Sequence, residues 1–276
     1  MLKKRMIFTL LYGNGNFHLS RNFRLQVVGD IKWLNQNYNF AKIAHSIDEL
    51  VVLDVSRGYR NEDDFCFALK ALAKDCFVPI SAGGGIRRVE SAEKLLHSGA
   101  DKIVVNSALY GENSFMSSLS SLLGEQSIIA SVDVKTGADG DHQIWTENGS
   151  NLIEENAEFW IQRLSDYPIG EIYLNSIGND GTGNGFEMDL LDILPSNLMK
   201  PVILAGGAGN SQHLLEALRD ERVDAVATAN LFNFVGDGLT DARKSIISKG
   251  VDLPMWKPIL DYQLQCYSSG LKKNED

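Results

Sequence analysis

Two stretches of similar sequence decide the fold of this chain. Residues 78–88 read VPISAGGGIRR and residues 201–212 read PVILAGGAGNSQ, so Ala-Gly-Gly follows an apolar run in both, 123 positions apart. Glycines in a tight strand-to-helix turn leave backbone N–H groups bare, and the start of a helix adds positive potential. A single turn of this kind is equally explained by backbone geometry, because glycine tolerates positive φ. The repetition favours a ligand that carries two phosphates.

Short β-branched runs alternate with longer amphipathic segments along the rest of the chain. This alternation is typical of βα units around a parallel sheet. The expected strands span residues 5–11, 49–55, 78–82, 102–105, 128–134, 171–176, 202–205 and 225–228, with helical patterns between them, as at 89–98, 154–167 and 212–220. Eight such units in 276 residues predict the α/β class. We expect a single (β/α)8 TIM barrel over residues 1–276, with 251–276 as a C-terminal extension.

The repeat also divides the expected barrel into two similar halves. At a shift near 122 positions the first four strands correspond to the last four. Glu49 then corresponds to Glu171, Asp54 to Ser176, and Leu11 to Asp133. One half therefore carries a carboxylate at a strand end where the other half carries an apolar side chain.

Composition limits the kinds of partner. The net charge of −10 argues against sequence-independent binding to nucleic acid or to an anionic membrane, because both require a basic surface. The 3 cysteines have unrelated spacings and no cluster has metal-ligand spacing, so we expect no metal and no cofactor. The N-terminal apolar run covers only residues 6–11, and no run of 18 apolar residues occurs. A soluble, cytoplasmic protein is expected.

Two aspartates are candidates for acid/base chemistry. Asp133 ends the apolar run IIASVD, so its carboxylate is expected at the mouth of the barrel, where the carboxyl ends of the strands gather. Asp180 follows the next strand in SIGNDGTG. Both also have a simpler interpretation, because aspartate often caps a strand end and NDG followed by TG is ordinary turn sequence.

Taken together, the motifs resemble those of one family. The runs ELVVLDV, GGGIR, GADKIVVNSA, SVDVK, GEIYLNSIGNDGTGNGF and AGGAG are similar to the cyclase subunit of imidazole glycerol phosphate synthase, a HisF-like resemblance that covers residues 1–234. The resemblance implies a barrel that binds a small substrate with a phosphate at each end. It also implies a glutaminase subunit on the opposite face, which sends ammonia through the barrel, and a pair of acid/base aspartates that cleave and cyclise the substrate.

The same resemblance assigns roles to individual residues. Asp133 matches the catalytic aspartate of the fifth strand, and Asp180 matches an auxiliary aspartate after the sixth. The matches to the two phosphate sites are Gly84, Gly85, Asn106 and Ser107 for one, and Gly206, Gly207 and Asn230 for the other, with Asn230 in place of a serine. The matches to a ring of charges at the ammonia entrance are Arg5, Glu49, Lys102 and Glu171. Each of these four opens a strand, so we expect them to neutralise one another in a buried layer. The alternative is that they merely face solvent.

Strand 1 and the segment after it depart from the family pattern. Leu11 stands where the family has its first catalytic aspartate, and residues 1–29 contain no Asp or Glu. Residues 12–20 lack the lysines that hold the family's substrate, which leaves His18 and Arg21 as the nearby basic candidates. Loss of one member of a cooperating acid/base pair typically costs about 10²–10⁴ in rate. These departures argue against a competent histidine-pathway cyclase.

Three functions follow as hypotheses. The chain resembles most a second-copy branch of the family that also has an apolar residue at the strand 1 position. That branch is associated with glycosyl amidation in lipopolysaccharide and other surface polysaccharide biosynthesis, together with a HisH-like glutaminase and a separate amidotransferase. There the barrel delivers ammonia for amidation of a nucleotide sugar. The alternatives are a true cyclase of histidine biosynthesis that uses Asp133 alone or with Asp180, and a non-catalytic scaffold that activates the glutaminase.

Overall fold

The computed structural model describes residues 3–37, 45–111, 113–229 and 238–255. Within these ranges, parallel strands close into a barrel, because β10 (Glu171–Ser176) pairs with β7 (Ile128–Thr136) and completes the circle. The other barrel strands are β1 (Arg5–Gly13), β4 (Glu49–Asp54), β5 (Ile80–Gly83), β6 (Lys102–Val105), β11 (Val202–Ala205) and β12 (Ala225–Thr228). The predicted (β/α)8 fold is confirmed, and each expected strand lies within two residues of its predicted ends.

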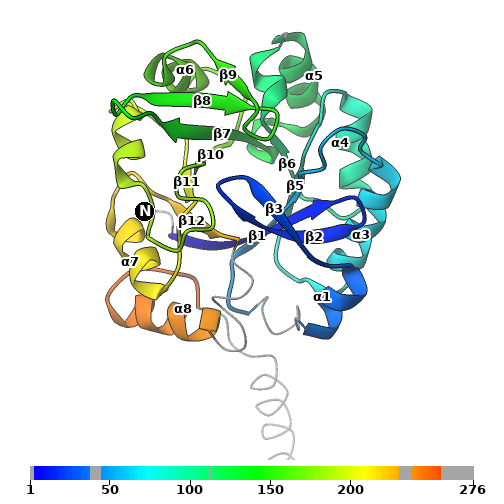
Figure 1. Ribbon diagram of the computed structural model, residues 1–276, viewed down its shortest axis with the longest axis horizontal. Coiled ribbons are helices and arrows are strands. Elements are labelled where there is room, and N and C mark those ends of the chain that lie inside the picture. Colours follow the sequence, from blue (N-terminus) through cyan, green and yellow to red (C-terminus); the bar gives the residue numbers. More distant parts are fainter. Residues whose placement is uncertain (1–2, 38–44, 112, 230–237, 256–276) are drawn as a thin grey trace, which may run out of the picture.

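Helices surround the barrel (Figure 1). They are α1 (Ile31–Asn37), α3 (Glu62–Asp75), α4 (Val89–Leu96), α5 (Asn113–Leu123), α6 (Ala157–Leu164), α7 (Ser211–Arg219) and α8 (Gly238–Ser248), with the short 3-10 helices η1 (Ser107–Tyr110), η2 (Glu125–Ser127) and η3 (Met188–Ile193). The side chains of Asn61, Asn156 and Asn210 each accept hydrogen bonds from two backbone N–H groups and fix the starts of α3, α6 and α7. None of the helices in the described ranges is both long and apolar enough to cross a membrane.

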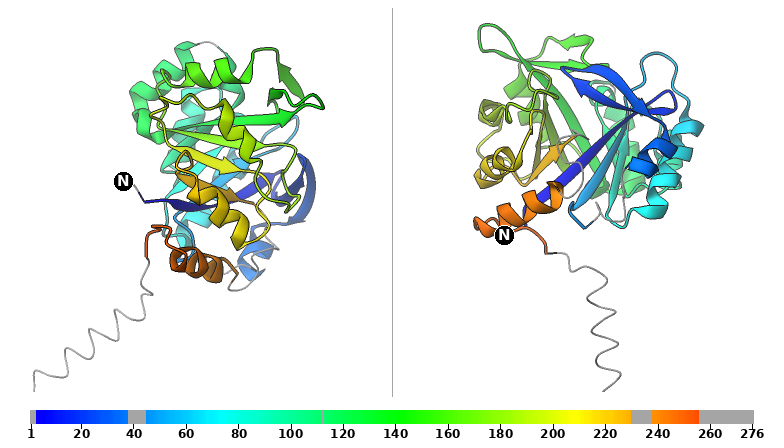
Figure 2. Two further views of the ribbon diagram at one scale, coloured as in Figure 1. Left: turned by 90° about the vertical axis from the view of Figure 1, so that its left-hand side faces the viewer. Right: turned by 60° about the horizontal axis from the view of Figure 1, so that its bottom comes forward.

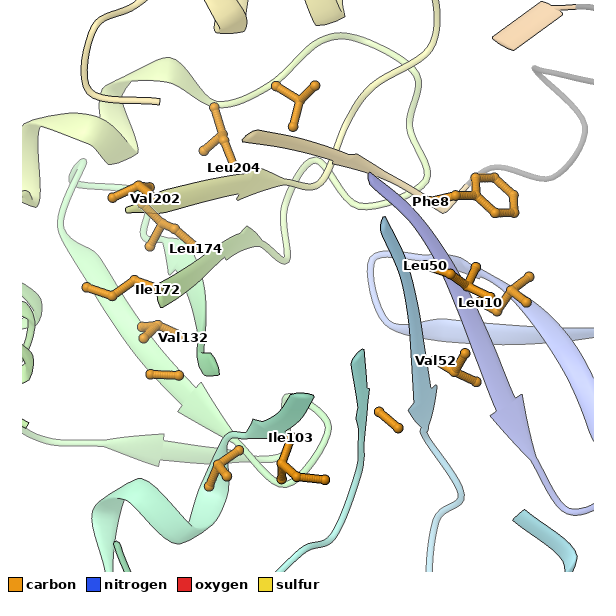
Figure 3. Close-up of a cluster of buried hydrophobic side chains, with 14 of the residues drawn as sticks. Phe8, Leu10, Leu50, Val52, Ile103, Val132, Ile172, Leu174, Val202 and Leu204 are labelled. Atoms are coloured by element: carbon orange, nitrogen blue, oxygen red, sulfur yellow. The ribbon is translucent and has the colours of Figure 1, made fainter. Parts of the chain in front are cut away.

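Side chains along each barrel strand alternate between two separate cores, because successive residues of a strand point to opposite faces. Outward-facing residues pack against the helices, as the sticks in Figure 3 show for Phe8, Leu10, Leu50, Val52, Leu174 and Leu204. Inward-facing residues fill the barrel itself with a second cluster of Ile7, Val51, Val104, Ile129, Tyr173, Ile203, Ala205, Ala225 and Ala227. The interior of the barrel is therefore an apolar column between its two ends.

The two halves share an extension above the barrel. β1 and β7 each run for 9 residues and continue into antiparallel hairpins, formed by β2 (Asn16–Arg21) with β3 (Arg24–Gly29) and by β8 (His142–Thr146) with β9 (Asn151–Ile153). The left view of Figure 2 shows both hairpins on the side of the barrel opposite the start of β1. Their tips meet, because a Cβ at Gly149 would lie 2.9 Å from the ring of Phe23. The segment after strand 1 is thus a hairpin over the mouth.

Candidate active site

The carboxyl ends of the barrel strands enclose a cavity of about 310 Å³ beneath the two hairpins. Inward-facing residues of the strands line its floor, among them Thr9, Leu11, Asp133 and Tyr173. This is the face on which barrels of this fold carry their active sites. The volume lies at the lower end of the range for small-molecule sites. Leu11 and Asp133, which correspond in the two halves, face the same space.

Asp133 is buried at the floor of this cavity and is held only by neutral groups. Its Oδ1 accepts a hydrogen bond from Asn175 Nδ2 at 2.9 Å, and its Oδ2 accepts one from Asn106 Nδ2 at 2.9 Å. Burial raises the pKa of Asp133 from 3.8 to about 6, with a further rise from the Asp180 carboxylate, while the two amide hydrogen bonds oppose the shift. A carboxyl group that titrates near neutrality is suited to exchange a proton with a bound substrate.

The remaining carboxylates that line the cavity, within the described residues, have charged or structural partners. Asp54 Oδ2 lies 3.8 Å from Arg60 Nε, and Glu147 forms an ion pair with Arg87. Both are therefore neutralised by an arginine of the cavity wall. Asp133 differs from them because no cation lies against it in the described structure.

Asp180 anchors the β2–β3 hairpin. Its Oδ2 accepts hydrogen bonds from the Ser20 hydroxyl and from the Phe23 N–H, the latter at 3.1 Å. Its backbone carbonyl accepts a third from the Asn22 N–H at 2.9 Å. Burial raises the pKa of Asp180, and the hydrogen bonds from Ser20 and Phe23 oppose that rise. The structure brings Asp180 to the mouth, and its contacts there hold the roof of the cavity, while a part in catalysis stays a prediction.

We expect Asp180→Ala to loosen the hairpin without unfolding the barrel. The variant removes the carboxylate that accepts the Phe23 N–H, and a hydrogen bond to a charged group is worth about 1.5–3 kcal/mol. Hydrogen exchange at the Phe23 amide should accelerate roughly tenfold or more. The exposed Asp189→Asn serves as the control. Unchanged exchange at Phe23 would show that the hairpin is held by other contacts.

The two glycine turns lie at the mouth in matching positions. Gly84 has φ +114° and Gly206 has φ +89°, a region that favours glycine. A Cβ at Gly84 would lie 2.2 Å from the carbonyl oxygen of Asp54, and one at Gly206 would lie 2.5 Å from that of Ser176. Since Asp54 corresponds to Ser176, the structure relates the two turns by 122 positions, one fewer than the 123 that the Ala-Gly-Gly letters indicate.

The other residues matched to the phosphate sites fall into different positions. Gly85 and Gly207 line the cavity and both have positive φ. Ser107 lines it too, and its Oγ accepts a hydrogen bond from the Glu147 N–H at 3.1 Å. The Asn106 amide donates to Asp133 and to the Ser131 carbonyl at 3.0 Å and so positions the carboxylate, while its part in a phosphate site stays a prediction. Asn230, the remaining residue predicted for the second phosphate site, lies outside the described residues.

At the opposite end of the barrel, Arg5, Glu49, Lys102 and Glu171 form a closed ring of ion pairs. Arg5 Nη1 lies 3.1 Å from Glu49 Oε2 and also pairs with Glu171, while Lys102 Nζ lies 3.3 Å from Glu49 Oε2 and 2.5 Å from Glu171 Oε1. The buried Ser81 hydroxyl donates to Glu49 Oε1 and adds a fifth member from β5. The glutamate side chains are 3% and 10% exposed, so the charges face one another and not solvent.

Comparison with known proteins places this barrel in a family. Residues 24–236 match the family described as histidine biosynthesis protein. The chain belongs to this family. A protein of Parasynechococcus marenigrum with the provisional name imidazole glycerol phosphate synthase subunit hisF2 is 47% identical over 88% of this chain and 90% of its own length. A hisF2 protein of Pseudomonas aeruginosa, also provisionally named, is 32% identical over 86% and 93%. The HisF subunit of Streptococcus gordonii is 31% identical over 92% and 99%.

Two residues of this HisF-like barrel were missed in the sequence, although a signal for them exists. Tyr173 and Asn175 lie two and four positions after Glu171 on β10, so the period of two places both inside the barrel with it. Tyr173 shares a hydrogen bond of 3.0 Å with Thr9 across the interior, and Asn175 binds Asp133. Counting inward-facing positions from the charged residue at the strand start would have found them.

The basic groups near the cavity also differ from those expected. His18 is buried beside Gly13 and does not line the cavity, because its neighbour Leu19 points inward from β2 instead. Arg21 does line it, and its role in holding a substrate stays a prediction. Arg60, from the segment between β4 and α3, lines it as well, and no periodic pattern marks a residue in such a segment. Only the folded chain reveals that arginine.

Proposed function

We propose that this HisF-like chain is a synthase subunit that receives ammonia from a partner glutaminase and uses it to amidate a nucleotide sugar for surface polysaccharide biosynthesis. The observation that carries the proposal is the arrangement along the barrel axis. A closed ring of charges lies at one end, an apolar column follows, and a single carboxyl group with a pKa of about 6, Asp133, stands at the floor of the mouth.

The column suits neutral ammonia. Its described lining of Ile7, Val51, Ile129 and Ile203, with alanines on β11 and β12, is apolar up to the Thr9 and Tyr173 hydroxyls. It offers no anionic partner for a charged ammonium ion, whose desolvation is costly. In the ring below it, Arg5 and Lys102 already neutralise Glu49 and Glu171, so the ring offers no unpaired anion that would attract ammonium. Ammonia released at the ring is thereby kept from water until it reaches the mouth.

The mouth suits attack by ammonia on one electrophilic carbon. The nitrogen lone pair forms the new C–N bond, a proton passes from that nitrogen to the Asp133 carboxylate, and the leaving group departs with the electrons of its bond to carbon. One base suffices for this step. Ring closure by an acid/base pair needs a second carboxyl facing the first, and Leu11 occupies that position in β1.

Exposed apolar side chains support a partner at the ring end. Phe77 and Met199 are 76% and 90% exposed on the segments that precede β5 and β11, and Met255, beyond α8, is 76% exposed. Segments that precede barrel strands lie at the amino-terminal face, beside the ring. Large exposed apolar residues on one face are typical of interaction sites. We propose that a HisH-like glutaminase covers this face and that a separate amidotransferase completes the system.

The test is an assay of the purified chain with ammonium chloride and the bisphosphate substrate of the histidine-pathway cyclase. With Leu11 in place of a carboxylate, we expect turnover below about 0.01 s⁻¹, at least 10²-fold under a typical enzyme. Turnover near 1 s⁻¹ that is lost in Asp133→Asn would identify a histidine-pathway cyclase and overturn the proposal. Amidation of a nucleotide sugar by the chain with its glutaminase, from glutamine as nitrogen source, is the result that supports it.

The histidine-pathway cyclase remains the second candidate. It is favoured by the raised pKa of Asp133 and by the two glycine turns, Gly84 and Gly206, which keep matching geometry in both halves. Substitution Leu11→Asp separates the two candidates further, because it supplies the missing carboxyl without altering the outer core. A gain of cyclase turnover in this variant is expected if the remaining mouth still fits the bisphosphate substrate.

A further inference from the structure

We propose that Tyr173 is a gate between the apolar column and the mouth of the barrel, closed in this structure and latched by Thr9. The inference rests on the proposed function only for what passes the gate, which is ammonia. Opening takes a turn of this one side chain away from Thr9 and toward the mouth. Ammonia from the column then reaches the floor of the cavity, where Asp133 stands.

Tyr173 lies at the boundary between the two spaces. Its side chain belongs to the inner cluster together with Ile7, Val51 and Ile129. It also lines the floor of the cavity, whereas Ile7, Val51 and Ile129 do not. Tyr173 is therefore in contact with the column on one side and with the mouth on the other.

The hydroxyl of Tyr173 reaches across the barrel interior. It shares a hydrogen bond of 3.0 Å with Thr9 Oγ1 on β1, although β11 and β12 lie between β10 and β1 in the sheet. The small side chains of Ala205, Ala225 and Ala227 face the interior from these two strands. They leave room that the phenol ring fills, because protein interiors are closely packed. The ring therefore spans this part of the interior and separates the column from the mouth.

The latch is weak and carries no charge. It is a single hydrogen bond between two neutral hydroxyls, and a bond of this kind contributes little to net stability. Burial raises the pKa of the Tyr173 phenol, so the hydroxyl stays protonated and adds no charge to the path. Ammonia both donates and accepts hydrogen bonds. A passing molecule of ammonia thus replaces, for each hydroxyl, the partner that the open gate removes.

A thiol placed in the column tests the gate in the purified chain. Val51→Cys puts it at a buried position on the column side, and peptide mass spectrometry follows its reaction with methyl methanethiosulfonate, a small neutral reagent. We expect this reaction to be slow in the chain with its gate intact. Thr9→Val removes the latch, keeps the shape of the side chain and should accelerate the reaction about tenfold or more. Tyr173→Ala removes the gate itself and should accelerate it further.

Two matched controls separate the gate from general loosening. Thr228 is a second buried threonine that lines the cavity, but its Oγ1 has no hydrogen-bond partner in the described structure, so Thr228→Val should leave the reaction at position 51 unchanged. Val52 is as buried as Val51 but points to the outer core. A thiol introduced by Val52→Cys becomes accessible only when the barrel itself opens, so Thr9→Val should not change its rate.

Two results would overturn the inference. One is a thiol at position 51 that reacts no faster with Thr9→Val than with Thr228→Val, which would show that the latch does not close the column. The other is an equal acceleration at position 52, which would show that Thr9→Val loosens the whole barrel. The labelling needs neither partner nor turnover. A confirmed gate without amidation therefore refutes the proposed function alone, and amidation with position 51 already open in the parent refutes this inference alone.

Discussion

Replacing Asp133 by asparagine is expected to stop turnover and, at the same time, to make the folded protein more stable at neutral pH. In the proposed function this carboxylate at the cavity floor is the proton acceptor, and loss of a general base typically costs about 10²–10⁴ in rate. Holding this carboxylate ionised lowers the free energy of unfolding, however, because burial raises its pKa from 3.8 to about 6. Asparagine removes the charge and keeps the shape.

The sign of the stability change follows from the direction of the pKa shift. A raised pKa means that the folded state binds the Asp133 proton more tightly than the unfolded state does, so ionisation weakens the fold as pH rises. The cost is absent below pH 3.8, grows between there and about pH 6, and is complete above it. A shift of about two units corresponds to roughly 3 kcal/mol, of which Asp133→Asn recovers part.

The environment accommodates the new amide. Asn106 cannot turn its amide, because it also donates to the Ser131 carbonyl, but the Asn175 amide donates only to Asp133 among the bonds described for it. A flip of Asn175 supplies the oxygen that the new N–H group needs. Urea unfolding at pH 7 should give a gain of roughly 1–3 kcal/mol over the parent, and the gain should vanish near pH 4.

The exposed Asp139→Asn, in the turn between β7 and β8, is the control and should change neither turnover nor stability at pH 7. A variant that loses activity but is less stable than the parent at pH 7 would contradict the assignment of a strained, charged carboxylate. An Asp133→Asn protein that keeps its activity would show that another group accepts the proton.

Glu171→Gln is expected to be strongly destabilising. The ring balances two cations against two anions, and glutamine leaves Arg5 and Lys102 with Glu49 as their one anionic partner in the ring. Removing one partner of a buried ion pair typically costs about 3–5 kcal/mol, and the partial exposure of Arg5 and Lys102, near one fifth, lowers our expectation to about 3 kcal/mol. Urea unfolding at pH 7 measures the loss.

The pH dependence of the parent provides a second readout. Burial on its own raises the pKa of Glu171, but hydrogen bonds and charge from Arg5 and Lys102 outweigh it and lower the pKa below its ordinary value of 4.5. The ring's contribution is therefore present above pH 4.5 and is lost as pH falls through the lowered pKa. The destabilising effect of Glu171→Gln should shrink over the same interval.

Glu125→Gln is the matched control for the ring. Glu125 lies near the same end of the barrel and pairs with Lys200 at 3.8 Å, but its side chain is 60% exposed. Exposed pairs of this kind contribute about 0–1 kcal/mol. If Glu171→Gln costs no more than Glu125→Gln, the four charges act as separate surface residues and the ring has no structural role.

Much of the fold was predictable because its signals are local and repeated. Strands such as β6, β10, β11 and β12 coincide with their predicted bounds, since each is a short apolar run between clear turn residues. Each ring residue stands at the start of a strand. This position predicts that the four side chains come together, because the parallel strands of a barrel all begin at the same end. What local patterns could not supply was the hairpin after β1, whose residues 12–20 lack a strong alternation of apolar and polar side chains.

The site was predictable in part. Asp133 and the glycines Gly84 and Gly206 can be recognised in the sequence because they stand at strand ends. The contacts of Asp180 and Asn106, in contrast, depend on elements far away in the chain. Asp180 is held by a hairpin about 160 positions earlier, and Asn106 turns to a carboxylate 27 positions later. Pairings of this length are set by closure of the barrel.

The sequence alone therefore determined the barrel, the twofold repeat, the residues of the ring and the absence of a carboxylate in strand 1, because each is a matter of residue type and period. Tertiary structure decided the rest. It alone placed Arg60 over Gly85 and hydrogen-bonded Asp180 to the hairpin above the cavity. It also placed Asp133 between two side-chain amides and raised the pKa of Asp133 to about 6. Burial and long-range contact, which no local pattern encodes, are the physical reason.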